Sequence, residues 1–151
     1  MRDVRRLLFR YDALQALPAD ADGAQTALED ASRLLLWRAW IALLQSLCAD
    51  YRLRPEAATD SMSEAPWLHS LRTFNPDMAE LQQIELASRD PDHWLPALRN
   101  WWSGYWQPGL IPPARLAPAA TIARSAADWS QDARAGLAAW ADLWAQHSQT
   151  N

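Results

Sequence analysis

The chain has three histidines, the side chains best suited to proton transfer or metal binding near neutral pH. None of His69, His93 and His147 has a second histidine, a cysteine or an acid at ligand spacing on the same helix face, as a His-Glu-x-x-His site would require. The acids beside His93, Asp90 and Asp92, are better explained as cap and turn residues. The sequence therefore predicts no metal site and no metal cofactor.

The sequence gives no support either for catalysis by a nucleophilic side chain or by a pair of acids. Cys48 lies inside an apolar helical run, so we interpret it as a buried small hydrophobic residue rather than a reactive thiol. The sequence contains no Gly-x-Ser-x-Gly motif and no glycine-rich phosphate loop. Glu29 and Asp30 are adjacent, and adjacent residues on a helix point in different directions. We therefore assign no catalytic residue, expect no organic cofactor and expect that the chain is not an enzyme.

A row of arginines interrupted by one aromatic ring is the best candidate for a binding surface. It occupies the polar face of the first predicted helix and comprises Arg2, Arg5, Arg6, Phe9 and Arg10. Such a face could dock an acidic protein, stack a nucleic-acid base or lie on an anionic membrane. The simpler interpretation, which the sequence favours, is a solvated helix face with Phe9 tucked under the C-terminal helix or the chain end.

The ten tryptophans are many to bury in one core, because each indole N–H needs a hydrogen-bond partner there. Helical spacing assigns half of them to the long second helix or to a seam by which the last helix docks, namely Trp37, Trp40, Trp129, Trp140 and Trp144. We expect Trp102 or Trp106 to reach the surface, where an exposed indole would mark an interface.

Helical spacing of apolar residues extends along most of the chain, and strand patterns are nearly absent. It predicts helical stretches over about 2–17, 24–51, 63–73, 75–88, 92–107 and 125–146, with Ser63, Asn75, Asp90 and Ser125 at their starts. Gly136 lies on the buried face of the last stretch, where another helix could approach. The fold class is therefore all-α, an irregular bundle of about five helices around a long central helix.

Length and charge restrict the organisation and the partners. A chain of 151 residues predicts a single helical domain over 1–151, with a Pro-rich connection at 108–121 before the C-terminal helix. The net charge of −4 argues against broad nucleic-acid binding, so DNA is not an expected partner. No apolar run approaches the roughly 20 residues of a membrane span, and Leu7-Leu8-Phe9 is too short for the core of a signal peptide. We expect a cytoplasmic protein.

The order of two segments resembles a known family. A long helix containing residues 27–36 and 41–44 precedes an Asp90-Pro91-Asp92-x-Trp94-Leu95 segment that ends in Trp106-Gln107-Pro108. This order is similar to a small proteobacterial helical family sometimes labelled PasA-like, a domain of unknown function. The similarity covers residues 1 to about 108 and, more loosely, the last helix. It implies a helical fold and a bacterial cytoplasm, but no activity.

Three functions of different classes remain open. The leading one is a noncatalytic interaction or regulatory module that binds a protein, or a second copy of itself, through an aromatic and arginine surface. The alternative is a small-molecule-binding or enzymatic pocket between helices, in which Arg38 and Gln45 would be converging polar groups. A weaker alternative is RNA or anionic-membrane binding through the first helix, which would depend strongly on salt.

Overall fold

The computed structural model describes residues 1–18, 22–55, 62–106 and 126–150, and the regular structure in these ranges is helical. Within these ranges lie the helices α1 (Arg2–Gln15), α2 (Asp22–Asp50), α3 (Ala65–Phe74), α4 (Ala79–Arg89), α5 (Trp94–Trp106) and α7 (Ala126–Thr150). The predicted all-α bundle around a long helix is confirmed, because α2 contacts α1, α3, α5 and α7. The expected connection at 108–121 and the expected cap Ser125 lie outside the described residues.

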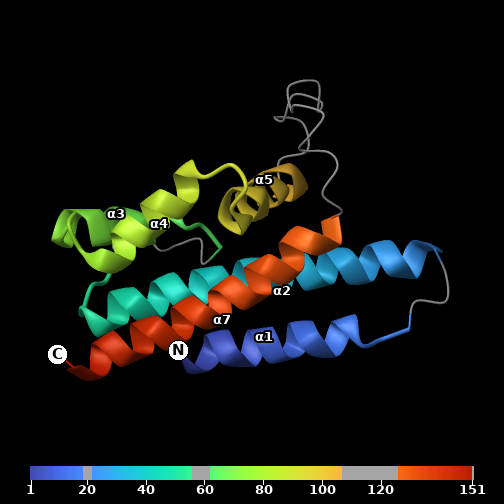
Figure 1. Cartoon of the computed structure of the whole chain (residues 1–151), viewed down its shortest axis with the longest axis horizontal. Coiled ribbons are helices and arrows are strands. Elements are labelled where there is room, and N and C mark those ends of the chain that lie inside the picture. The colour runs from blue at the N-terminus through green and yellow to red at the C-terminus, as the bar shows by residue number, and fades with distance from the viewer. Residues whose placement is uncertain (19–21, 56–61, 107–125, 151) are drawn as a thin grey trace.

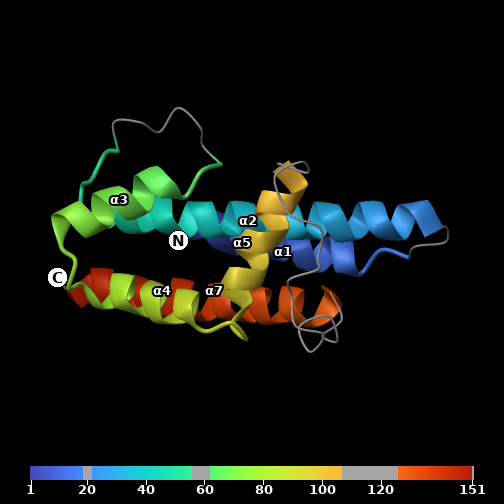
Figure 2. The same cartoon turned by 90° about the horizontal axis from the view of Figure 1, so that it is seen from above.

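The helices form three layers, with α1 on one side, α2 and α7 in the middle, and α3, α4 and α5 on the other side (Figure 1). Seen from above, α3 lies along α2 and α4 lies along α7 (Figure 2). Helix α1 runs antiparallel to α2, because the Met1 amino group donates to Ser46 at 2.9 Å and Gln15 donates to Ser32 at 2.9 Å. The middle layer is therefore covered on both faces, as its wide apolar surface requires.

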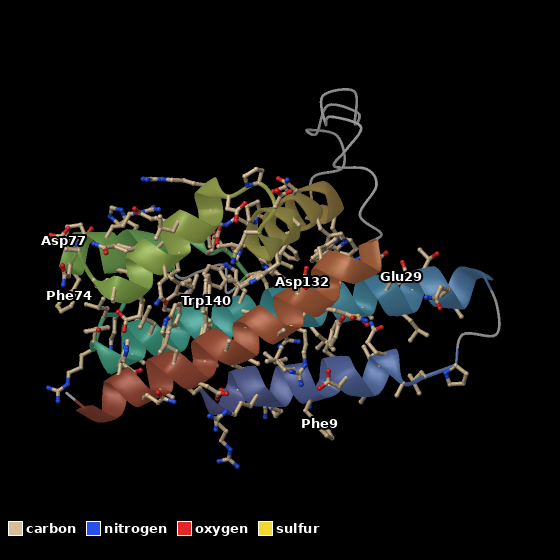
Figure 3. All side chains as sticks on the ribbon, in the orientation of Figure 1. Phe9, Glu29, Phe74, Asp77, Asp132 and Trp140 are labelled. Carbon is tan, nitrogen blue, oxygen red and sulfur yellow. The ribbon has the colours of Figure 1, made fainter. Side chains whose placement is uncertain are left out.

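A cluster of indole rings joins the middle layer to α5, and we call its four members, Trp40, Trp94, Trp140 and Trp144, the tryptophan seam. Neighbouring ring centroids in the seam lie 5.1 Å (Trp94–Trp140), 5.4 Å (Trp140–Trp144) and 6.0 Å (Trp40–Trp140) apart. Figure 3 shows Trp140 between the layers. A Cβ at Gly136 would lie 2.7 Å from Cε2 of Trp94, so glycine is what lets α5 approach α7. This confirms the close approach expected at Gly136.

A polar network closes the top of the seam. Nη2 of Arg99 donates to Oε2 of Glu64 at 3.0 Å, and Nε of Arg99 lies 2.7 Å from Oε1 of the same carboxylate. Nε1 of Trp40 donates to Oε2 of Glu64 at 2.7 Å, and Arg99 also donates to Ser88 at 2.6 Å. The guanidinium of Arg99 is half-buried, because it pairs with Glu64 just before α3 and donates to Ser88 on α4.

The two Asx-Pro-Asp segments were expected to cap helices, and both instead form turns just before them. Asn75 Oδ1 accepts the N–H of Asp77 at 3.0 Å, and α4 begins only at Ala79. Asp90 Oδ1 likewise accepts the N–H of Asp92 at 3.0 Å, and α5 begins at Trp94. The side chains satisfy a turn N–H rather than a helix N–H, so each helix starts later than predicted.

Smaller differences concern helix ends. Helix α3 begins at Ala65 after Glu64, not at the expected cap Ser63, and Pro66 occupies its first turn. Helix α1 ends at Gln15, two residues before the expected end, and α7 continues to Thr150. Helix ends fray, and one or two residues of difference there carry little meaning.

Candidate functional site

The outer face of α1 forms a ridge, and we call its five residues, Arg2, Arg5, Arg6, Phe9 and Arg10, the α1 ridge. The opposite face of α1 is buried against α2 and α7 through Val4, Leu7, Leu8 and Tyr11. Phe9 lies almost opposite this stripe, so its ring points away from the bundle and is 73% exposed (Figure 3). The expectation that Phe9 would be tucked under the C-terminal helix or the chain end is wrong among the described residues, because the ring stays largely exposed although it lines a groove between α1 and α7.

Between α1 and α7 lies a shallow groove of about 280 Å³, which we call the α7-side groove. Two ion pairs cross it: Arg5 to Asp142 at 2.8 Å, and Arg134 to Asp12 through two bonds of 3.0 and 2.7 Å. The hydrogen bond from Arg134 to Asp12 raises the pKa of the guanidinium above its usual value. The charges of this groove therefore largely neutralise one another within the chain.

On the other side of the ridge, between α1 and α2, lies a groove of about 230 Å³, which we call the arginine groove. Its lining includes Arg6, Arg10, Arg38 and Gln45, so two sequence candidates, the arginine face and the Arg38–Gln45 pair, meet here. Arg6 pairs with Asp3 at 3.1 Å on its own helix. Arg10 and Arg38 are exposed and form no ion pair within the described residues.

The floor of the arginine groove is apolar. Leu7 of α1 and Ile41 and Ala42 of α2 line it and are buried. Arg10 and Arg38 also line the groove and are exposed, so their guanidinium groups stay hydrated. The groove thus offers an apolar base edged by positive charge.

The predicted surface tryptophans have different outcomes. Trp102 is only partly buried, and its ring stacks on Trp37 at 4.9 Å with planes 10° apart. Trp101 stacks on Tyr105 at 5.1 Å, and Tyr105 is 46% exposed. Trp102 thus lies at the edge of the core rather than on a free surface. Trp106 ends α5, and its side chain lies outside the described part.

The three histidines lie on different elements, His69 on α3, His93 just before α5 and His147 on α7. Nδ1 of His93 accepts the N–H of Leu95 at 3.1 Å, so this ring acts like an N-cap for α5 while stacking on Trp140. Burial lowers the pKa of His93 below its usual value, and Asp90 opposes that shift. His147 lies 3.3 Å from the buried carboxylate of Glu80. Across residues 1–18, 22–55, 62–106 and 126–150, no three metal-binding side chains come together.

Sequence reasoning missed a hollow of about 320 Å³ at the shared end of α2, α4 and α7. Asp50, Tyr51, Glu80 and His147 line it, and Arg52 beside them has a left-handed backbone with φ of 57°. Burial, together with the charges of Glu80 and Asp50, raises the pKa of the Tyr51 hydroxyl. The chain distance between these residues left no pattern in the sequence that could have predicted their meeting.

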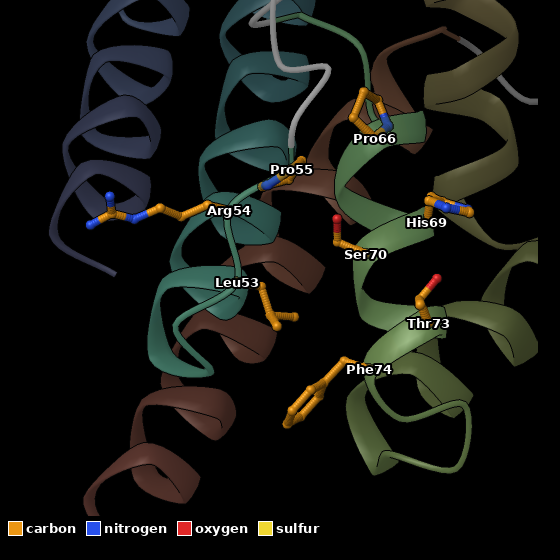
Figure 4. Close-up of a pocket in the computed structure, with 8 residues that line it drawn as sticks. All are labelled: Leu53, Arg54, Pro55, Pro66, His69, Ser70, Thr73 and Phe74. Carbon is orange, nitrogen blue, oxygen red and sulfur yellow. The ribbon is translucent and has the colours of Figure 1, made fainter.

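A wider hollow of about 510 Å³ separates the segment after α2 from α3. Figure 4 shows that its polar side chains diverge, with Arg54 directed to one side and His69 to the other. Such an arrangement does not converge on a ligand as a binding pocket requires.

Cys48 is buried and donates weakly to the carbonyl of Trp67 at 3.7 Å. The predicted burial of this cysteine is confirmed, and burial raises the pKa of its thiol to about 11.

Among the helices as described, none has the length and apolar character to cross a membrane. No protein-family model, curated protein or solved structure matches the chain. The resemblance to the PasA-like family therefore stays a prediction.

Proposed function

We propose that the chain is a noncatalytic interaction module that docks a protein partner on the α1 ridge. The observation that carries this proposal is the phenyl ring of Phe9, 73% exposed at the centre of a face otherwise made of arginines. Aromatic residues and arginine are enriched in protein interfaces, whose energetic centre is commonly an aromatic anchor covered by the partner.

The surroundings of Phe9 distinguish it from other exposed apolar side chains. Single exposed apolar residues are common on soluble proteins, and Leu86 on α4 is one, at 67% exposure. Phe9, however, lies on a ridge with a groove on each side, and arginines edge both grooves. A partner can therefore cover the ring and contact both flanks of α1 at once, which an isolated residue does not allow.

Site-specific photo-crosslinking in cells of the native host tests this proposal. A photoreactive phenylalanine analogue at position 9 should give one discrete adduct, and the same analogue at position 86 should give none. The mass of the adduct separates a different protein from a second copy of this chain. Equal labelling at both positions, or no adduct at position 9, would contradict the proposal.

A second candidate is a small-molecule site in the hollow at the end of α2, α4 and α7. It is favoured by the convergence of Asp50, Tyr51, Glu80 and His147 on one concave space. A thermal-shift screen with small metabolites should then find a ligand whose effect disappears in Glu80→Gln and persists in Glu85→Gln. A ligand shift retained in Glu80→Gln would exclude this hollow as the site.

A further inference from the structure

The two grooves beside the α1 ridge differ in how far their arginines form ion pairs with carboxylates of the chain. In the α7-side groove, Asp142 and Asp12 pair with Arg5 and Arg134 at 2.8 and 2.7 Å. In the arginine groove, Asp3 is the one lining carboxylate among the described residues, and it pairs with Arg6 while Arg10 and Arg38 line the groove as well. Within the described residues, positive charge is therefore left unmatched on the α2 side of α1, in a chain whose net charge is −4.

We infer that the arginine groove binds an acidic, amphipathic segment of a partner protein. In this arrangement, carboxylates of the segment pair with Arg10 and Arg38, and an apolar side chain of the segment covers Phe9. The inference rests on the proposed docking role of the α1 ridge and adds the chemistry of the partner. Its support is charge complementarity, because guanidinium groups form forked hydrogen bonds with carboxylates.

The apolar floor of the groove favours a peptide over a bare anion. Leu7, Ile41 and Ala42 are 7, 3 and 9% exposed, so they form a narrow apolar strip that one apolar side chain can contact, and inorganic phosphate gains nothing from it. Gln45 adds an amide that can donate to, or accept from, a peptide backbone. An amphipathic segment laid along a groove uses both features.

The same surface fits nucleic acid and membranes less well. Asp3, Asp12 and Asp142 lie along α1 and its neighbour, and their carboxylates repel a continuous line of phosphates. A membrane-lying helix presents a broad apolar face, whereas the α1 ridge has one ring among arginines. A protein segment can place its acids and its apolar side chain at the matching positions.

Selection from random short peptides displayed on phage tests the inference on the full chain. Peptides selected on the wild type should be enriched in Asp and Glu around an apolar residue. Their affinity should fall roughly three- to tenfold in Arg10→Glu and again in Arg38→Glu, by loss of an exposed ion pair and added repulsion. Arg89→Glu, an exposed position on α4 with the same change in charge, should leave the affinity unchanged.

Further variants separate this inference from the proposed function. If selected peptides lose affinity in Phe9→Ser but keep it in Arg10→Glu and Arg38→Glu, the ridge docks a partner and the acidic chemistry is wrong. If no variant of the ridge alters peptide binding, the proposed function fails as well. Binding of single-stranded RNA or of phosphatidylglycerol vesicles that exceeds peptide binding, and is lost in the two arginine variants, would overturn the inference in favour of those ligands.

Discussion

The tryptophan seam and the α1 ridge use aromatic rings and arginines in opposite ways. In the seam, the indole of Trp40 donates to Glu64, and Arg99 pairs with the same carboxylate. On the ridge, Phe9 is 73% exposed, and Arg10 forms no ion pair within the described residues. Residue type alone therefore does not separate structural from binding side chains in this chain. The structural side chains are those whose ring is covered, and whose charge is paired, by other parts of the same chain.

The largest effect is expected when the seam loses a ring. Trp40→Ala removes a fully buried indole that contacts Trp94 and Trp140, so unfolding free energy should fall by about 3–5 kcal/mol. Trp101→Ala, at a partly exposed position, should cost clearly less. Urea denaturation followed by circular dichroism measures both. Equal losses would mean that burial does not distinguish the seam from the partly exposed tryptophans.

Adding one methyl group should also disturb the seam. In Gly136→Ala the new Cβ would overlap the ring of Trp94, and overpacking of this kind costs about 1–3 kcal/mol. The higher helix propensity of alanine offsets about 1 kcal/mol of that loss. In combination with Trp94→Leu, Gly136→Ala should no longer cause the steric overlap and should cost less free energy of unfolding. The two changes should therefore be non-additive in a double-mutant cycle. Simple additivity would show that α7 and α5 do not meet at this glycine.

Two ion pairs allow a half-buried interaction to be compared with an exposed one: Glu64 with Arg99, and Glu85 with Arg72. Glu64→Gln should cost about 1–3 kcal/mol, because Arg99 loses its counter-ion in a half-buried position. Glu85→Gln breaks an exposed 3.3 Å pair with Arg72 and should cost less than about 1 kcal/mol. Thermal melts of the two variants give the ranking. A larger loss of stability in Glu85→Gln than in Glu64→Gln would show that the Glu64–Arg99 network does not stabilise the fold.

The imidazole of His93, which stacks on Trp140 at the edge of the seam, should contribute to the pH dependence of stability. Burial lowers the pKa of His93 in the folded state below 6.5, so the unfolded chain takes up this proton first as the pH falls. His93 should therefore cost stability as the pH drops below about 6.5, and contribute no slope above it. His93→Asn keeps a side-chain acceptor for Leu95 and removes the titration, so it should flatten this part of the profile. An unchanged slope would assign it to other groups.

The sequence predicted what a single helix determines and missed what depends on how helices meet. Spacing placed Trp40 and Trp144 in the core and the α1 arginines outside, because a helix face follows directly from periodicity. It could not predict that Glu64 reaches Arg99, 35 residues away, since that depends on how α3 and α5 lie over α2. For the same reason Arg38 and Arg10 were predicted as separate candidates, and only the rotation of α2 against α1 brings them to one groove.

The smallest effect on stability is expected where the effect on binding is expected to be largest. Phe9→Ser removes a ring that is 73% exposed, so the free energy of unfolding should change by no more than about 0.5 kcal/mol. Leu86→Ser, at 67% exposure on α4, should behave in the same way in the melt. Only the first variant should lose partner binding. A marked loss of stability in Phe9→Ser would show that the ring is covered within the chain, and the contrast between seam and ridge would then disappear.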